Sequence, residues 1–158
     1  MDFVAVLLIV AVVTSGFFVG IIVAMIGVIQ TVLNGLDYAT FTSVMQAIIV
    51  SGRKSPFVWA FLLLPIIASM LALILLWDAM TEAPFFWTVV GLVLFVAGPL
   101  LVSRLFNEPY YDQVMTWKPD AEVPGWEQKR TQWFRLNLLR FSIGSLACVA
   151  FALALAAF

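Results

Sequence analysis

Six residues near the C-terminus share one helical spacing and include a cation and an amide. Intervals of four, three, four, three and four positions place them in one stripe along an α-helix: Trp126, Arg130, Trp133, Asn137, Arg140 and Gly144. Residues 136–158 carry a single charge, that of Arg140. An ionisable group inside a membrane is costly and normally faces the bundle interior with a partner. The stripe therefore indicates a polar site inside an apolar bundle.

Arg140 has two interpretations. Counted from Phe134, it lies roughly 9 Å along the helix at about 1.5 Å per residue, a depth from which its side chain can extend to the headgroups. Alternatively it faces inward, and its candidate partners are Asp112, Glu108 and Asp37. Asn137 on the same stripe favours the inward orientation, because an amide gains nothing from facing lipid.

The residues that are missing exclude several kinds of chemistry. The chain has no His and one Cys, Cys148, which excludes Ser-His-Asp catalysis, His-ligated metals and haem. We therefore expect no metal site and no cofactor. A net charge of -1 without a basic excess makes nucleic acid an improbable partner.

Composition identifies the elements that must position the stripe. Of 158 residues, 64% are hydrophobic and 11% charged, against roughly 45–50% and about 25% in a soluble domain. About 20 apolar residues cross a bilayer core as a helix. Four apolar runs satisfy this: 3–33, 57–77, 85–103 and 135–158. The sequence predicts one all-α domain, an integral membrane four-helix bundle in contact with the lipid bilayer.

The basic residues predict an orientation. Seven of the eight lie in the connections 34–56 and 104–135, and Arg140 follows. The positive-inside rule then places both connections in the cytoplasm. Both termini and the turn at 78–84, which carries Asp78 and Glu82 but no base, are expected on the outer side.

The two basic connections are not plain loops. Asp37 is a candidate N-cap for a short interfacial helix over 38–51, which Gly52 is expected to close. The segment 104–133 is expected to be an aromatic-rich loop. Its tyrosines and tryptophans fit an interfacial aromatic belt, or a lid folded over the bundle mouth. In the first span, Gly16 and Gly20 form a GxxxG spacing that permits close helix contact.

Taken in order, four stretches resemble the anthrone-oxygenase-like family of small four-helix membrane proteins. The resemblance covers nearly the whole chain and departs from the family's pattern at Thr31, Ile49 and Tyr111. The stretches are Gly16–Gly20; Leu36–Tyr38 with Val44–Ile48 and Ser55–Phe57; Phe106–Pro109 with Asp112; and Trp133–Arg140.

The resemblance implies oxidation of a lipophilic aromatic or quinone-like substrate by oxygen, without a cofactor. Such a reaction requires a bound flat substrate, assisted deprotonation and a stabilised enolate oxygen. The residues implied as catalytic are Asn137 and Arg140 for the oxyanion and Asp112 as the base. The residues implied as substrate-binding are Trp133, Trp126, Asn107 and Gln46.

Other functions stay open at the level of sequence, including whether the protein is an enzyme. The apolar surface also fits a non-catalytic accessory or structural subunit that packs against a larger membrane complex, or a homo-oligomer. A small transporter ranks last, because few intramembrane charges and no inverted repeat are present.

Overall fold

The computed structural model describes residues 2–158 as four long helical rods that lie side by side. The first rod joins α1 (Phe3–Ala24), a π-helical segment η1 (Met25–Ile29) and α2 (Gln30–Asn34). The second consists of α3 (Tyr38–Lys54) and α4 (Pro56–Leu75). A 3-10 turn, η2 (Trp77–Ala79), leads to the third: α5 (Ala83–Phe95), π-helical η3 (Val96–Asn107) and α6 (Glu108–Met115). The fourth rod is α7 (Trp126–Ala157).

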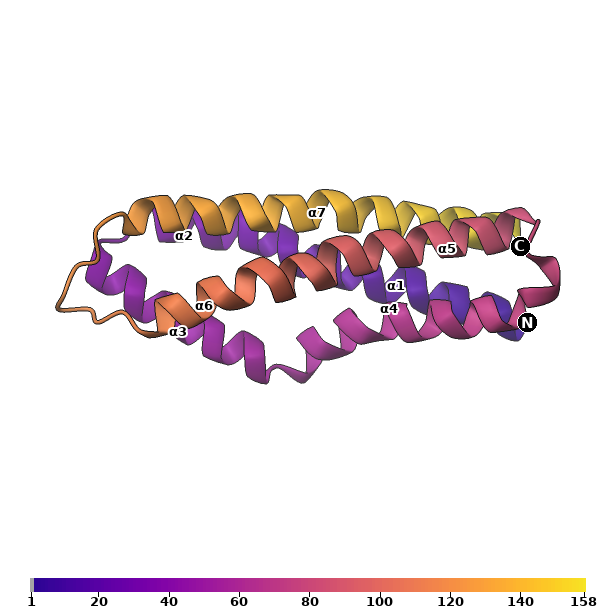
Figure 1. The fold of residues 1–158 in the computed structure, drawn as a ribbon, viewed down its shortest axis with the longest axis horizontal. Helices are drawn as coiled ribbons and strands as arrows, with labels where there is room; N and C mark the ends of the chain where they lie inside the picture. The colour runs from indigo at the N-terminus through magenta and orange to yellow at the C-terminus, as the bar shows by residue number, and fades with distance from the viewer. Residues whose placement is uncertain (1) are drawn as a thin grey trace.

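Four helices are long and apolar enough to cross a membrane: Phe3–Asn34, Pro56–Leu75, Ala83–Met115 and Trp126–Ala157. The all-α bundle and the multi-pass membrane character predicted from the sequence are thereby confirmed. The chain termini lie at one end of the bundle (Figure 1). The 20 residues of α4 extend about 30 Å, the thickness of the hydrocarbon core. The other three spans are about 48 Å long, so the end formed by α2, α3 and α6 extends beyond the hydrocarbon.

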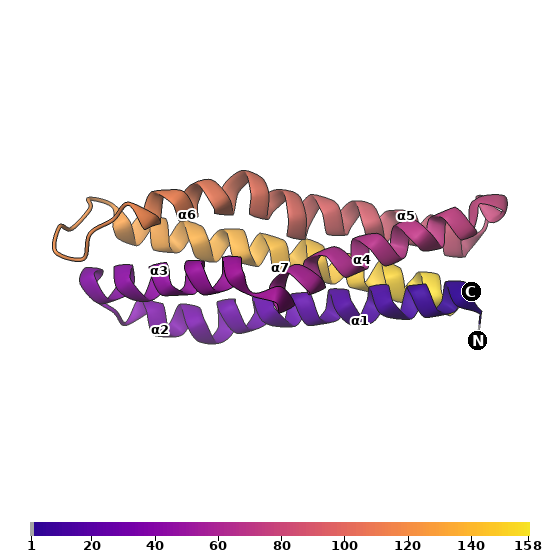
Figure 2. The same ribbon diagram turned by 90° about the horizontal axis from the view of Figure 1, so that it is seen from below.

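Helix α3 was expected at 38–51 as an interfacial helix, but it continues to Lys54 and runs along the bundle axis. Figure 2 shows it beside α2, with α6 across from it. Asp37 is its N-cap as predicted, since Asp37 Oδ1 accepts from the Thr40 N–H at 2.9 Å. Gly52 lies inside the helix, and the break falls at Ser55. The apolar face of α3 packs on aromatic side chains of α6 and α7, which accounts for its direction.

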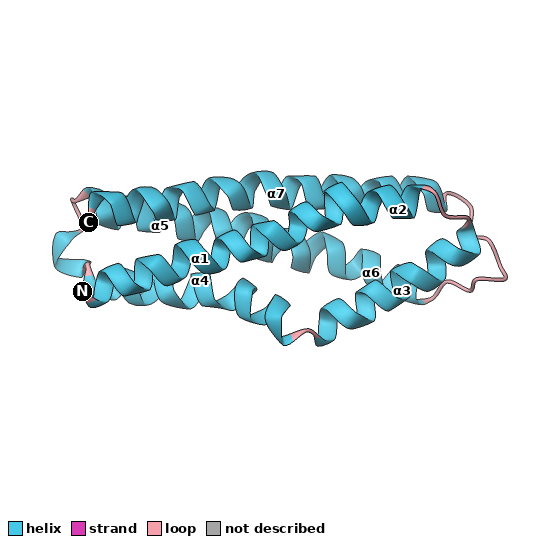
Figure 3. Ribbon diagram, turned by 180° about the vertical axis from the view of Figure 1, so that it is seen from behind, coloured by secondary structure: helices cyan, strands magenta, loops and turns pink. Residues whose placement is uncertain are grey.

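The expected loop 104–133 is mostly helical, and only 116–125 connects α6 to α7. Figure 3 shows loops confined to the two ends of the bundle and the break between α3 and α4. Pro109 stands in the first turn of α6, directly after π-helical η3, and the rod continues through it. Local π-helical adjustment is one way in which a helix accommodates a proline. Gly125 precedes α7 with φ +79°. The aromatic residues of this region fill a core with α3 and form no separate lid.

Two hydrophobic clusters divide the bundle lengthwise. The first occupies the end with the termini and includes Leu8, Phe18, Ile22, Phe95 and Phe151. The second occupies the opposite end and contains the buried faces of α3, α6 and the start of α7: Tyr38, Phe41, Met45, Tyr110, Val114, Trp117, Trp126 and Trp133.

The closest helix contacts do not use the GxxxG spacing. A Cβ added at Gly20 would meet nothing within 4 Å, and one at Gly16 would lie 3.9 Å from Cys148 Sγ. In contrast, a Cβ at Gly91 would lie 2.5 Å from the Phe151 ring. A Cβ at Gly98 would lie 2.6 Å from Ile143 Cβ. Gly91 and Gly98 therefore let α7 pack tightly against α5 and η3.

Candidate functional site

One cavity of about 620 Å³ is lined by side chains from all four rods. Ligand pockets in proteins are typically about 300–1,000 Å³, mostly apolar, with a few convergent polar groups. The apolar wall here includes Phe18, Ile22, Leu62 and Leu100. The cavity borders both hydrophobic clusters and lies at the level of the break between α3 and α4.

Arg140 contributes the most interior charge of this cavity. Its Nη1 donates to Asn137 Oδ1 at 3.0 Å, and its guanidinium carbon lies 5.4 Å from the centre of the Phe18 ring. Its Nε is buried without a partner among the described residues. Within residues 2–158 both ion pairs involve Arg53, so none of the three expected carboxylate partners binds Arg140. The inward-facing cation is instead surrounded by the Asn137 amide oxygen, the Phe18 ring and the Tyr111 phenol.

Asn107 provides a second unsatisfied polar group in the cavity wall. It is 0% exposed, and neither Oδ1 nor Nδ2 has a hydrogen-bond partner among the described residues. A buried amide without partners costs about 1–3 kcal/mol. The cavity wall thus contains an amide donor and an amide acceptor that are unsatisfied in the described chain.

Asn137 and Trp133 are oriented by bonds within α7 and to α6. Asn137 Nδ2 donates to the Trp133 carbonyl oxygen at 3.1 Å, which fixes its Oδ1 toward Arg140. Trp133 is 2% exposed and its Nε1 donates to the Tyr111 hydroxyl at 3.4 Å. Tyr111 also lines the cavity, so an indole and a phenol border it together.

An ion cluster lies on the polar side of the cavity. Arg53 Nη2 contacts Glu108 Oε2 at 2.6 Å and Asp112 Oδ1 at 2.7 Å. The hydrogen bonds that Arg53 donates to Asp112 and Glu108 raise the pKa of its guanidinium above the ordinary value. The Trp59 Nε1 donates to the Arg53 carbonyl oxygen at 2.9 Å, which ties the end of α3 to the start of α4.

Four of the seven residues implied by the sequence line the cavity: Asn107, Trp133, Asn137 and Arg140. The other three lie outside its lining. Asp112 is 72% exposed at its side chain and binds Arg53.

Gln46 Nε2 donates to the carbonyl oxygens of Val114 and Trp117, each at 3.0 Å. Trp126 packs on Phe41 with ring centres 5.2 Å apart. Both residues therefore hold α3 against the other helices at the polar end.

Sequence reasoning did not place Arg53, Trp59 and Tyr111 at the site, although all three line the cavity. Glu108, expected as a partner of Arg140, also lines the cavity but binds Arg53. One signal was available: Tyr111 follows Asn107 by four positions, which puts both on one helical face. That signal appears only if 104–115 is helical, and the prediction of a loop concealed it.

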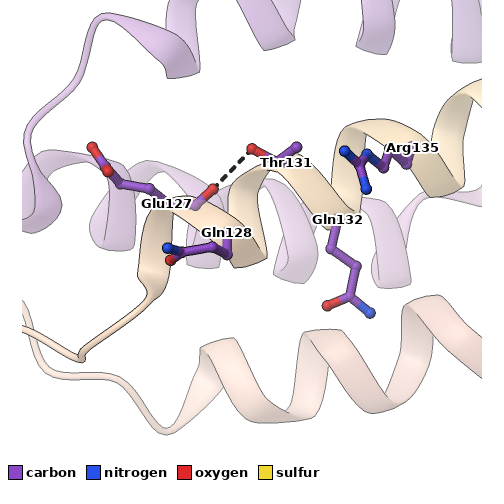
Figure 4. Close-up of a pocket in the computed structure, with 5 residues that line it drawn as sticks. All are labelled: Glu127, Gln128, Thr131, Gln132 and Arg135. Atoms are coloured by element: carbon purple, nitrogen blue, oxygen red, sulfur yellow. Dashed lines mark hydrogen bonds between the residues drawn. The ribbon is translucent and has the colours of Figure 1, made fainter.

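A second hollow lies on the outer face of α7 and has a volume of about 400 Å³. Figure 4 shows its lining side chains projecting from one stretch of that helix: Glu127, Gln128, Thr131, Gln132 and Arg135. Its one internal bond runs from Thr131 Oγ1 to the Glu127 carbonyl oxygen at 3.0 Å. A hollow formed by one exposed helix face encloses nothing, so we do not treat it as the site.

Within the described chain, residues 2–158, no group of three or more metal-ligating side chains is present. Comparisons of the chain with family models, curated proteins and solved structures found no match. The function must therefore be argued from the cavity itself.

Proposed function

We propose that the protein is a membrane enzyme that oxidises a lipophilic aromatic substrate with molecular oxygen in the cavity between the four rods. One observation carries the proposal. The orphaned amide of Asn107 and the carboxylate-free guanidinium of Arg140 line one apolar cavity. The resemblance to anthrone-oxygenase-like proteins supports the same chemistry and names the substrate class.

The lining matches a flat apolar molecule that carries a carbonyl group. Phe18, Leu62 and Trp133 offer apolar and aromatic surface to rings. Arg140 and Asn107 offer donors to an oxygen on which negative charge develops. Donors fixed in a dry site stabilise such an oxygen far better than water does.

The proposed reaction converts a ring methylene to a carbonyl. A C–H bond of the methylene breaks, its electron pair moves to the ring carbonyl oxygen, and an enolate results. Oxygen accepts electrons from the enolate carbon, forms a C–O bond, and is protonated to a hydroperoxide. Loss of the second C–H proton with cleavage of the O–O bond releases water. The net change is CH2 plus O2 to C=O plus H2O, with oxygen as the oxidant and no cofactor.

Oxygen consumption with an anthrone in lipid nanodiscs tests the proposal. Arg140→Ala is expected to lower turnover by about 100-fold or more, the usual effect of removing one oxyanion donor. Arg135→Ala is the matched control, because it removes the same side chain from the same helix outside the cavity. Equal rates for the Arg140 variant and the control would contradict the role of Arg140.

The accessory-subunit alternative lacks a comparable observation. Large apolar side chains are exposed on all four rods, for example Phe17, Trp59, Phe86 and Leu146, as lipid contact requires. Failure of the wild-type protein both to bind and to oxidise an anthrone would contradict the enzyme proposal and favour the subunit.

We also propose that the polar end of the bundle is cytoplasmic, as the distribution of lysines and arginines indicates. Single cysteines placed by Asp120→Cys or Phe158→Cys, in a Cys148→Ala background, report sidedness through a maleimide that does not cross membranes. Intact cells should label only the cysteine at 158. Labelling only at 120 would reverse the orientation.

A further inference from the structure

We infer that Glu108, and not Asp112, is the base that removes the substrate proton. The inference rests on the proposed function and names the residue that performs its first step. The resemblance assigned that step to Asp112. The structure places Glu108 in the cavity wall and Asp112 outside it.

The bonds around Glu108 leave one carboxylate oxygen available. Arg53 Nε and Nη2 both donate to Glu108 Oε2, at 3.0 and 2.6 Å. Within the described chain no donor binds Oε1. A carboxylate oxygen that no donor occupies is available to accept a proton.

A second and independent feature borders the same cavity. Asn107 is 0% exposed, and among the described residues its two amide atoms have no partner. Asn107 and Glu108 both line this cavity, so a molecule inside it lies within the walls that both residues form. Arg140 lies on α7 in the wall of the same cavity and is available for the ring oxygen.

Asp112 acts through Arg53. Its Oδ1 accepts from Arg53 Nη2 at 2.7 Å, and its side chain is 72% exposed. Asp112 is thus a positioning residue that holds the guanidinium against Glu108. The Glu108 side chain is 31% exposed, so it borders both the cavity and the aqueous side.

The proton balance of the step is simple. The methylene C–H bond breaks, the proton binds Glu108 Oε1, and the electron pair of the bond moves to the ring carbonyl oxygen. The same proton then neutralises the peroxide formed when oxygen adds to the enolate carbon. Glu108 is a carboxylate again before the second C–H proton is removed and water departs.

The test compares Glu108→Gln with Asp112→Asn, two substitutions that each exchange one carboxylate of the same ion cluster for an amide. Glu108→Gln should lower anthrone turnover by about 100-fold or more, in the range of lost acid–base catalysis. Binding, read from quenching of tryptophan fluorescence, should change less than fivefold. Asp112→Asn should retain more than a tenth of the turnover. A larger loss for Asp112→Asn than for Glu108→Gln would overturn the assignment.

Two further measurements separate a base from a merely structural residue. Anthrone enolate prepared in advance and mixed with Glu108→Gln should be oxidised as fast as by the wild type, because proton removal is bypassed. Formate should restore turnover to Glu108→Ala and have no effect on Arg140→Ala. Slow oxidation of the preformed enolate together with absent formate rescue would overturn the inference. An inactive wild type would instead contradict the proposed function.

Discussion

Replacing Asn107 by Leu should make the protein more stable and less able to bind its ligand. The Asn107 side chain is completely buried, and its amide oxygen and nitrogen have no protein partner. Leucine has nearly the same shape and no polar atoms. The substitution therefore removes a desolvation penalty without opening a cavity.

The expected gain is the cost of an unsatisfied buried amide, about 1–3 kcal/mol in the free energy of unfolding. Binding should change in the opposite direction. Loss of one directed hydrogen bond to the ligand should weaken anthrone affinity by at least about tenfold, equivalent to roughly 1.4 kcal/mol.

The same substitution at Asn137 is the control, and its expected sign is opposite. Asn137 donates to the Trp133 carbonyl oxygen and accepts from Arg140. Asn137→Leu breaks both bonds and leaves the guanidinium without an amide partner, so it should destabilise the protein by about 1–3 kcal/mol.

Thermal unfolding in detergent, followed by tryptophan fluorescence with and without an anthrone, measures both effects. Asn107→Leu should melt above the wild type without ligand and show a smaller shift with ligand. If both leucine variants melted below the wild type by similar amounts, the Asn107 amide would have a partner inside the protein. The reasoning about the cavity would then be refuted.

Three other predictions follow from single contacts. Gly91→Ala should destabilise the bundle by about 1–3 kcal/mol, because the new Cβ would lie 2.5 Å from the Phe151 ring. Gly20→Ala is the control and should be neutral or stabilising in the same melting assay, since nothing lies within 4 Å of a Cβ placed there. Gln46→Leu should lower the free energy of unfolding by about 1–3 kcal/mol, because two hydrogen bonds to backbone carbonyl oxygens are lost. Its effect on anthrone affinity should be smaller than that of Asn107→Leu. An equal loss of affinity would place Gln46 at the ligand. The hydrogen bond from the Thr40 backbone N–H lowers the pKa of Asp37 from its ordinary value of 3.8. The ionised Asp37 therefore stabilises α3 above that value, and this stabilisation is lost as pH falls through the lowered pKa. Asp37→Asn should make the loss of helix content at acid pH, measured by circular dichroism, less steep, and an unchanged pH dependence would contradict this.

Much of the fold could be predicted from residues that act locally. Apolar runs locate the four spans, and Asp37 marks the start of α3 because a cap needs only the next few residues. The stripe on α7 brought Trp133, Asn137 and Arg140 together correctly because helical spacing alone determines it.

The remainder depends on contacts between distant segments. Pro109 and neighbouring aromatic residues favoured a loop, yet packing of Tyr110 and Val114 keeps that segment helical. The pairing of Arg53 with Glu108 joins positions 55 apart in sequence, which no local pattern encodes. The choice of Gly91 over Gly20 for close contact likewise depends on where Phe151 lies.

The break at Ser55 places the cavity on the boundary between two solvents. Because α4 matches the thickness of the hydrocarbon core, its first turn, with Val58 and Trp59 in the cavity wall, marks where that core ends. An aromatic substrate and oxygen both dissolve preferentially in hydrocarbon, whereas the water that the proposed reaction forms does not. For that reaction, a cavity at this depth would receive both reactants from the bilayer and release the product water to the aqueous side.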